Sequence, residues 1–127
     1  MANTPENLFY TKEHEWVEDL GNQKVRFGIT DYAQNSLGDI VFVALPAIGD
    51  MISVGQSCGE VESTKSVSEI YAPVTGVVVG VNEKVETTPE IINRDSYNLG
   101  WLIEVEVTNS LNEFKLLSAE EYQELTQ

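Results

Sequence analysis

Cysteine and histidine are almost absent from this sequence of 127 residues, which contains one of each, Cys58 and His14. A single cysteine cannot form a disulfide within the chain, and its isolation agrees with a reducing compartment. Two such residues are too few for a zinc site, which takes about four ligands. They could in principle form a hydrolase pair, but a lone cysteine beside Gly59 is more typical of a small buried apolar side chain. We therefore expect Cys58 to be structural and the chain to have no catalytic residue and no metal site.

Positive charge and long apolar runs are also scarce. Lysine and arginine number 7 against 21 aspartates and glutamates, which gives a net formal charge of −14 and a pI near 4.2. Such a chain repels nucleic acid and anionic membranes, which argues against both as partners. No apolar run approaches the ~20 residues of a membrane-spanning helix, and Met1–Glu6 lacks the basic region of a targeting peptide. We expect a cytoplasmic protein, or the matured form of an organellar one.

The sequence does contain the pattern of a β-hairpin, over residues 59–76. Val61 and Ser63 fall on one face of its first strand, as the two-residue period of a strand requires. The Ser-Thr-Lys-Ser stretch that starts at Ser63 is small and polar, which suits a solvated turn. Pro73 then breaks the returning strand. This pattern places Lys65 at the exposed tip of the hairpin.

Most exposed lysines are simply solvated charges, and that is the first interpretation to test for Lys65. The chain has only five lysines, however, and this one stands among Glu60, Glu62 and Glu69. A modifying enzyme would therefore meet a distinctive charge pattern at this tip. We interpret Lys65 as a candidate modification site.

The length of 127 residues predicts that residues 1–127 form one domain, and the polar start predicts flexibility over residues 1–7. The predicted strands cover residues 13–18, 24–29, 40–45, 77–81 and 102–107. Thr30 or Asp31 can cap a short helix that Gly38 ends. Residues 82–84 are predicted to form a loop, and residues 87–92 a helical turn.

A C-terminal helix is predicted over residues 118–125. Ser118 and Glu121 have the spacing of a capping box, in which each side chain satisfies a backbone N–H of the other residue. We expect Leu116, Leu117, Tyr122 and Leu125 to pack this end against the rest of the chain.

Several motifs, in this order, resemble the glycine cleavage system H-protein family over nearly the whole chain. They are His14-Glu15-Trp16, Gly28–Gln34, Leu37–Val43, Glu62-Ser63-Thr64-Lys65, Ile70–Val78, Gly100-Trp101-Leu102 and Ser118–Tyr122. Each motif alone is a weak signal, but together they are specific.

The resemblance implies a mainly β fold of the lipoyl and biotinyl carrier type. This fold is a sandwich of two small antiparallel sheets, called a barrel-sandwich hybrid, with short helices and a C-terminal helix. A weak internal repeat agrees with it: Gly38–Val43 followed by Asp50–Ile52 resembles Gly76–Val81 followed by Glu83–Val85. Lys65 lies near the midpoint between the two copies.

For function, the resemblance implies that Lys65 carries lipoate through an amide, on an arm that reaches on the order of 14 Å. Such a carrier takes the aminomethyl group of glycine from the PLP-dependent glycine decarboxylase and delivers it to the tetrahydrofolate-dependent aminomethyltransferase. Dihydrolipoamide dehydrogenase then reoxidises it, and a lipoate ligase or an octanoyl or lipoyl transferase attaches the cofactor. We expect the chain to act as a monomeric carrier and not as an enzyme.

Two alternatives use the same lysine. The chain could be an H-like relay that passes lipoyl groups to other acceptors. It could also be a lipoyl domain of a 2-oxo acid dehydrogenase, although those domains usually have Asp before the lysine and lack His14-Glu15-Trp16. A biotin carrier would usually flank the lysine with methionines, where Thr64 and Ser66 stand here.

The amine on a loaded arm would be protonated at neutral pH and would need shelter from water. Carboxylates near the root of the arm could provide that shelter. Glu69 lies on the returning strand of the hairpin, on the same alternation phase as Lys65, and Glu15 lies beside Trp16. We predict that Glu15 and Glu69 form this cradle, against the alternative that they belong to a generally acidic surface.

Overall fold

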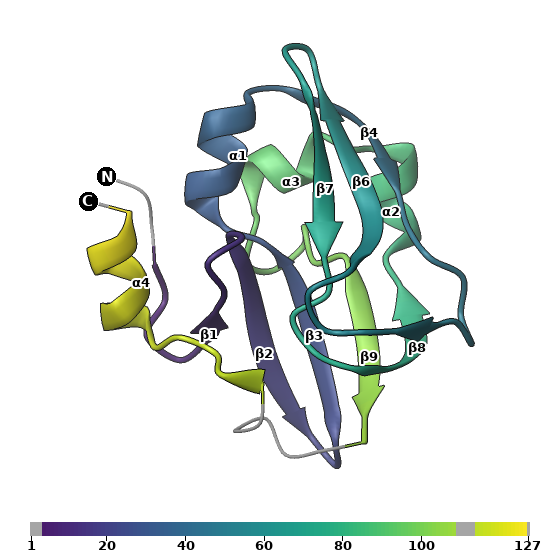
Figure 1. Ribbon diagram of the computed structural model, residues 1–127. Helices are drawn as coiled ribbons and strands as arrows, with labels where there is room; N and C mark the ends of the chain where they lie inside the picture. Colours follow the sequence, from purple (N-terminus) through teal and green to yellow (C-terminus); the bar gives the residue numbers. More distant parts are fainter. Residues whose placement is uncertain (1–3, 109–113, 127) are drawn as a thin grey trace.

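A computed structural model describes residues 4–108 and 114–126, which form two antiparallel β-sheets with four short helices around them (Figure 1). The larger sheet has the strand order β1-β2-β3-β9-β8-β5 and the smaller one β4-β6-β7. The strands are β1 (Phe9–Tyr10), β2 (Glu15–Gly21), β3 (Lys24–Ile29), β4 (Ile40–Ala44), β5 (Met51–Ile52), β6 (Ser57–Ser63), β7 (Val67–Tyr71), β8 (Gly76–Val81) and β9 (Ile103–Val107). The predicted mainly β sandwich of two antiparallel sheets is therefore confirmed.

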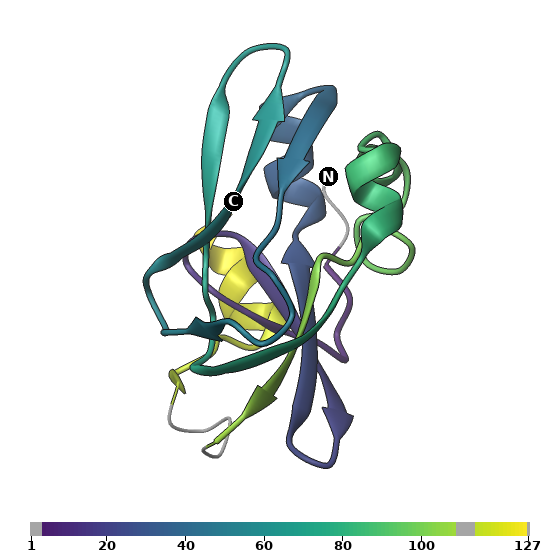
Figure 2. The same ribbon diagram turned by 90° about the vertical axis from the view of Figure 1, so that its right-hand side faces the viewer.

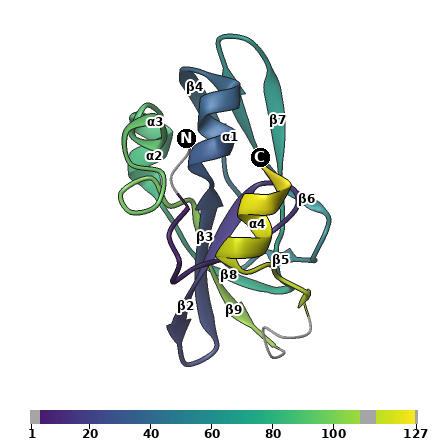
Figure 3. The same cartoon turned by 90° about the vertical axis from the view of Figure 1, so that its left-hand side faces the viewer.

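The helices begin where a polar side chain can cap them. In α1 (Asp31–Leu37), the Thr30 side chain accepts a hydrogen bond from the Ala33 N–H, and Gly38 ends the helix with a φ of 84°. In α4 (Ala119–Leu125), Ser118 is the N-cap and forms the predicted capping box with Glu121. The other two helices are α2 (Glu83–Thr87) and α3 (Ile91–Arg94). Figure 3 shows α1 and α4 on one side of the molecule.

The main core lies between the two sheets. Phe27 and Val105 of the larger sheet and Val61 and Ile70 of the smaller one are at most 1% exposed and belong to one cluster. Each such side chain contributes about 1.5–3 kcal/mol through removal from water. This cluster fixes β6 and β7, and it therefore fixes the base of the hairpin.

A second core cluster joins α4 to the start of β2. The rings of Tyr10 and Tyr122 stack with 4.8 Å between their centroids. Trp16 is fully buried, and its indole N–H donates to the Ser96 carbonyl at 2.9 Å. The C-terminal helix is thus packed against the segment that holds His14 and Glu15.

Several expectations were wrong in detail. The predicted loop at residues 82–84 begins α2, because the Asn82 side chain accepts from the Lys84 N–H as an N-cap. The short strands β1 and β5 were not predicted, since two residues are too few to show alternation. Leu125 is 48% exposed and does not pack as predicted.

The internal repeat holds only in part. The first segments of the two copies, Gly38–Val43 and Gly76–Val81, contain β4 and β8, one in each sheet. The second segments differ, because Asp50–Ile52 contributes strand β5 whereas Glu83–Val85 lies in helix α2. The predicted flexible segment 1–7 falls partly on residues 1–3, which lie outside the described residues. Of the remainder, the Pro5 carbonyl accepts a hydrogen bond from the Tyr10 hydroxyl. None of the helices within the described ranges is long and apolar enough to span a membrane.

Candidate functional site

The β6–β7 hairpin extends beyond the rest of the molecule, with its turn at the far end (Figures 1 and 2). Ser63 organises this turn. Its hydroxyl oxygen accepts from the backbone N–H groups of Lys65 and Ser66, at 3.2 and 3.1 Å, and the hydroxyl donates to the Ser66 carbonyl. Because Ser63 is itself buried, these bonds are shielded from water and hold the turn in one conformation. The exposed Lys65 is thereby presented at the tip.

The Lys65 side chain lies over Gly38, at the end of α1. A Cβ added at Gly38 would lie 3.0 Å from Lys65 Cε, a contact that the flexible lysine can relieve, and it is the φ of 84° that favours glycine here. The Thr64 N–H also donates to the Asp39 carbonyl at 3.1 Å, which ties the turn to the chain that follows α1. Lys65 therefore starts directly above helix α1.

A cleft of about 320 Å³ lies between α1, the segment before β2, and the hairpin. Its lining combines apolar side chains, such as Ile29, Val61 and Ile70, with charged or polar ones. It is lined by Glu13, His14, Glu15, Ile29, Tyr32, Ala33, Ser36, Leu37, Val61, Ser68, Glu69 and Ile70. The structure thus brings the two predicted carboxylates, Glu15 and Glu69, to one cleft, together with Glu13.

Glu15 is only 2% exposed, which is unusual for a carboxylate. Its side-chain oxygens accept from the Thr11 hydroxyl at 2.6 Å and from the Tyr71 N–H at 3.3 Å. Burial raises the pKa of Glu15 to about 8, because desolvation outweighs these two hydrogen bonds. At neutral pH the group is therefore largely uncharged.

Glu69 has a different environment. Its side chain is exposed, and its carboxylate accepts a hydrogen bond from the Ser57 hydroxyl across the hairpin. In the strand register it stands opposite Glu60, so two carboxylates face each other at this position. Glu69 thus brings an accessible acceptor to the rim of the cleft.

His14 occupies the cleft in a constrained position that sequence did not predict. Its backbone has a φ of 71°, in the left-handed region. Its Nδ1 lies 2.8 Å from the Tyr122 hydroxyl, and its ring packs on Tyr32 with 4.8 Å between centroids. The Tyr122 hydroxyl also contacts Thr30 Oγ1 at 2.7 Å. Burial lowers the pKa of His14, which favours the neutral imidazole.

Cys58 lies outside this cleft and packs against the main core. Its Sγ–H donates to the Ile70 carbonyl at 3.4 Å. Burial, reinforced by the negative charge of Glu15, raises the pKa of Cys58 to about 12, so the thiol stays protonated. A protonated thiol is a poor nucleophile, and this position supports the structural interpretation.

Comparisons with known proteins agree with this architecture. A sequence profile described as glycine cleavage H-protein matches residues 8–127. The glycine cleavage system H protein of Carboxydothermus hydrogenoformans is 51% identical over 125 residues, covering 98% of this chain and 95% of that protein. The corresponding protein of Mycobacterium bovis is 52% identical over 110 residues, covering 87% and 82%. A crystal structure of a glycine cleavage system H protein from Mycobacterium marinum superimposes with a TM-score of 0.86 at 43% identity, covering 94% and 96%.

A sandwich of two antiparallel sheets with a lysine at a hairpin tip is the architecture of the lipoyl and biotinyl carrier domains. Within this class, the chain belongs to the glycine cleavage H-protein family.

Proposed function

We propose that this chain is the lipoyl-lysine carrier of a glycine cleavage system, with lipoate attached to Lys65. It would carry the aminomethyl group of glycine from glycine decarboxylase to aminomethyltransferase. Dihydrolipoamide dehydrogenase would then reoxidise the lipoyl group. A lipoate ligase or an octanoyl or lipoyl transferase would modify it. The named relatives are bacterial, and we place this monomeric carrier in the cytoplasm.

The observation that carries this proposal is the position of Lys65 at the tip of a hydrogen-bonded turn, with its side chain over Gly38 at the end of α1. A long acyl group on this amine fits such a position, because the amide removes the charge and the hairpin keeps the arm clear of most of the surface. Leu37, the residue before Gly38, already lines the cleft. Helix α1 therefore leads from the modified lysine towards Glu15.

Bound lipoate supplies a disulfide that accepts and releases the aminomethyl group. The chain's own contribution is a surface that binds the hydrocarbon part of the arm and excludes water from its end. Ile29, Val61 and Ile70 provide apolar walls, and Glu13, Glu15 and Glu69 provide acceptors for a protonated amine. We propose Glu15 and Glu69 as the principal pair.

The two carboxylates would act with different strength. An exposed ion pair, as at Glu69, contributes about 0.2–1 kcal/mol. A carboxylate in a partly dry site attracts an amine at ~4 Å by about 4 kcal/mol at an effective dielectric constant of 20. Glu15 must first lose its proton, however, since its pKa is raised to about 8. A cation beside it would favour ionisation, so seating the amine would release a proton.

The first experiment tests attachment and role together. The unmodified chain is incubated with a lipoate ligase, and intact mass and peptide mapping locate the adduct. The modified chain is then mixed with purified glycine decarboxylase and assayed for glycine–bicarbonate exchange. We expect one adduct, on Lys65, and exchange that depends on it. An adduct on Lys84, or no adduct on folded protein, would contradict the site; an adduct without exchange would favour the relay.

The second experiment tests the cradle. Glu15→Gln and Glu69→Gln should leave modification of Lys65 unchanged and should speed decay of the loaded carrier, roughly two- to fivefold for Glu69→Gln. Glu106→Gln, an exposed glutamate on β9, is the matched control. If both cleft variants protect the cargo as long as the unaltered chain does, the cradle assignment is wrong.

A further inference from the structure

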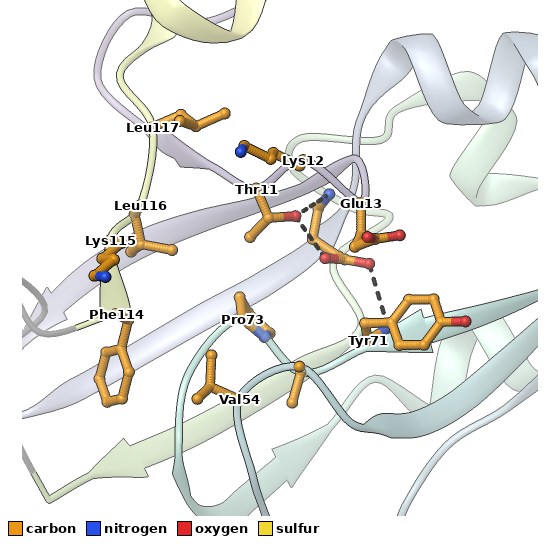
Figure 4. Close-up of a pocket in the computed structure, with 13 residues that line it drawn as sticks. Thr11, Lys12, Glu13, Val54, Tyr71, Pro73, Phe114, Lys115, Leu116 and Leu117 are labelled. Atoms are coloured by element: carbon orange, nitrogen blue, oxygen red, sulfur yellow. Dashed lines mark hydrogen bonds between the residues drawn. The ribbon is translucent and has the colours of Figure 1, made fainter. Parts of the chain in front are cut away.

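A second cavity, of about 300 Å³, shares Glu13 and Glu15 with the cleft, and Figure 4 shows its lining. Four separate segments meet there: the turn between β1 and β2, the turn between β5 and β6, the end of β7, and the segment before α4. Its volume is at the lower limit of small-molecule sites, so it suits a ligand of a few carbon atoms.

The walls of this cavity are mainly apolar. Val54, Pro73, Phe114 and Leu116 contribute side chains to it (Figure 4). Val54 is 46% exposed, so part of the apolar lining is open to solvent. An apolar surface of this shape gains free energy when it covers a hydrocarbon group.

Two lysines, Lys12 and Lys115, line the same cavity (Figure 4). They come from opposite ends of the sequence and represent two of only five lysines in a chain of net charge −14. Both are exposed, and over residues 4–108 and 114–126 the one salt bridge is that between Arg26 and Glu104. The amines of Lys12 and Lys115 are thus available to an external anion.

The carboxyl groups of the cavity offset this positive charge only in part. Glu13 is exposed and lies at the edge shared with the cleft. Glu15 is hydrogen-bonded to Thr11 and Tyr71. Because its pKa is raised to about 8, Glu15 is mostly neutral at pH 7 and does not repel an anion.

We propose that this cavity is a binding site for a small amphiphilic anion, a carboxylate with a short hydrocarbon body. The body would lie against Val54, Pro73 and Leu116, and the carboxylate would face Lys12 and Lys115. Glu13 and Glu15 line both this cavity and the cleft. A bound anion would therefore change the electrostatic environment of these two carboxyl groups, which also face the cleft.

Hexanoate is a suitable probe, and the unmodified chain is sufficient, so the test does not depend on the function of Lys65. In a two-dimensional ¹H–¹⁵N titration, we expect saturable shifts at the amides of residues 11–15, 54–55, 71–72 and 114–117. The ¹³C shift of the Glu15 carboxyl should change with the same midpoint. Hexylammonium, which has the same body and the opposite charge, should bind more weakly.

Variants separate the charge from the apolar wall. Lys12→Gln and Lys115→Gln should each weaken hexanoate binding about threefold, as for exposed ion pairs. Lys24→Gln and Lys84→Gln, at exposed lysines outside the cavity, should have no effect. Val54→Asn, a neutral polar change at this 46% exposed turn position, should abolish the saturable shifts. Unsaturable shifts, shifts elsewhere, or equal binding by the Lys12→Gln/Lys115→Gln double variant would overturn the proposal.

Discussion

At the residue scale, Glu15 has the most altered chemistry of the candidate cradle. It is buried with two hydrogen bonds, and its pKa is raised from 4.5 to about 8. Between these pH values the folded chain keeps a proton that the unfolded chain has released. The free energy of unfolding should therefore fall as pH rises through this window.

This linkage predicts the behaviour of Glu15→Gln. The unaltered chain should lose roughly 2–4 kcal/mol of stability between pH 4.5 and pH 8 on account of Glu15. The neutral glutamine cannot ionise, so the variant should lose much less over the same range. Denaturant unfolding at several pH values measures both curves, with Glu106→Gln, at an exposed glutamate on β9, as control. Parallel curves for Glu15→Gln and the unaltered chain would contradict the raised pKa.

Cys58 provides a second prediction at this scale. Its thiol is partly buried, protonated and bonded to the Ile70 carbonyl, so we expect packing to be its only contribution. Cys58→Ala should keep full carrier activity and lose about 1 kcal/mol of stability. Denaturant unfolding and the exchange assay measure the two quantities. Lost activity in a variant that still folds would show a role for the thiol.

At the scale of elements, one side chain adds to the backbone hydrogen bonds that hold the hairpin turn. Ser63 Oγ joins the backbone of Lys65 and Ser66, and its removal leaves these N–H groups without their acceptor. A loosened turn would present Lys65 in many orientations to a modifying enzyme.

Ser63→Ala should therefore slow the modification of Lys65 by several-fold, since a lost hydrogen bond of about 1 kcal/mol corresponds to roughly fivefold. The initial rate of adduct formation by intact mass measures this effect. Ser68→Ala is the matched control, because the Ser68 hydroxyl bonds only weakly to its neighbour's carbonyl, at 3.5 Å. Equal rates for both variants would mean that the turn is held by other contacts.

Helix α4 supports the cleft indirectly, through Tyr122. The hydroxyl of this residue contacts both His14, which precedes β2, and Thr30, which follows β3. The C-terminal helix thereby holds the segment that carries Glu13 and Glu15. This arrangement gives the C-terminal helix a structural role at the candidate site.

At the scale of the whole molecule, the net charge of −14 is the dominant electrostatic property. A strongly acidic carrier associates faster with enzymes that present a basic surface around their active sites. Screening by salt should weaken this attraction, because the Debye length falls from about 10 Å at 0.1 M to about 3 Å at 1 M.

We therefore expect kcat/KM for modification by a lipoate ligase to fall about tenfold or more between low and high salt, mainly through KM. Steady-state rates at several ionic strengths measure this dependence. The ligase reaction with a short neutral peptide acceptor is the control, and its rate should change little. A salt-independent KM for the protein substrate would exclude electrostatic steering.

The sequence by itself determined the features that depend on neighbours within about four positions. Strand alternation, the Thr30 cap, the Ser118–Glu121 capping box and the Ser-Thr-Lys-Ser turn are local, so their residues specify them directly. The missed start of α2 was also local, since Asn82 is a capping residue that we interpreted as part of a loop. Motif order also indicated the family, because the motifs extend over nearly the whole chain.

Only the tertiary structure decided how distant residues meet. His14 and Tyr122 are 108 positions apart, and Lys12 and Lys115 reach one cavity from opposite ends of the chain. The raised pKa of Glu15 likewise depends on the segments that exclude water from it. Desolvation and cavity shape are properties of everything packed around a group, and a local pattern contains no information about the chain that returns from far away.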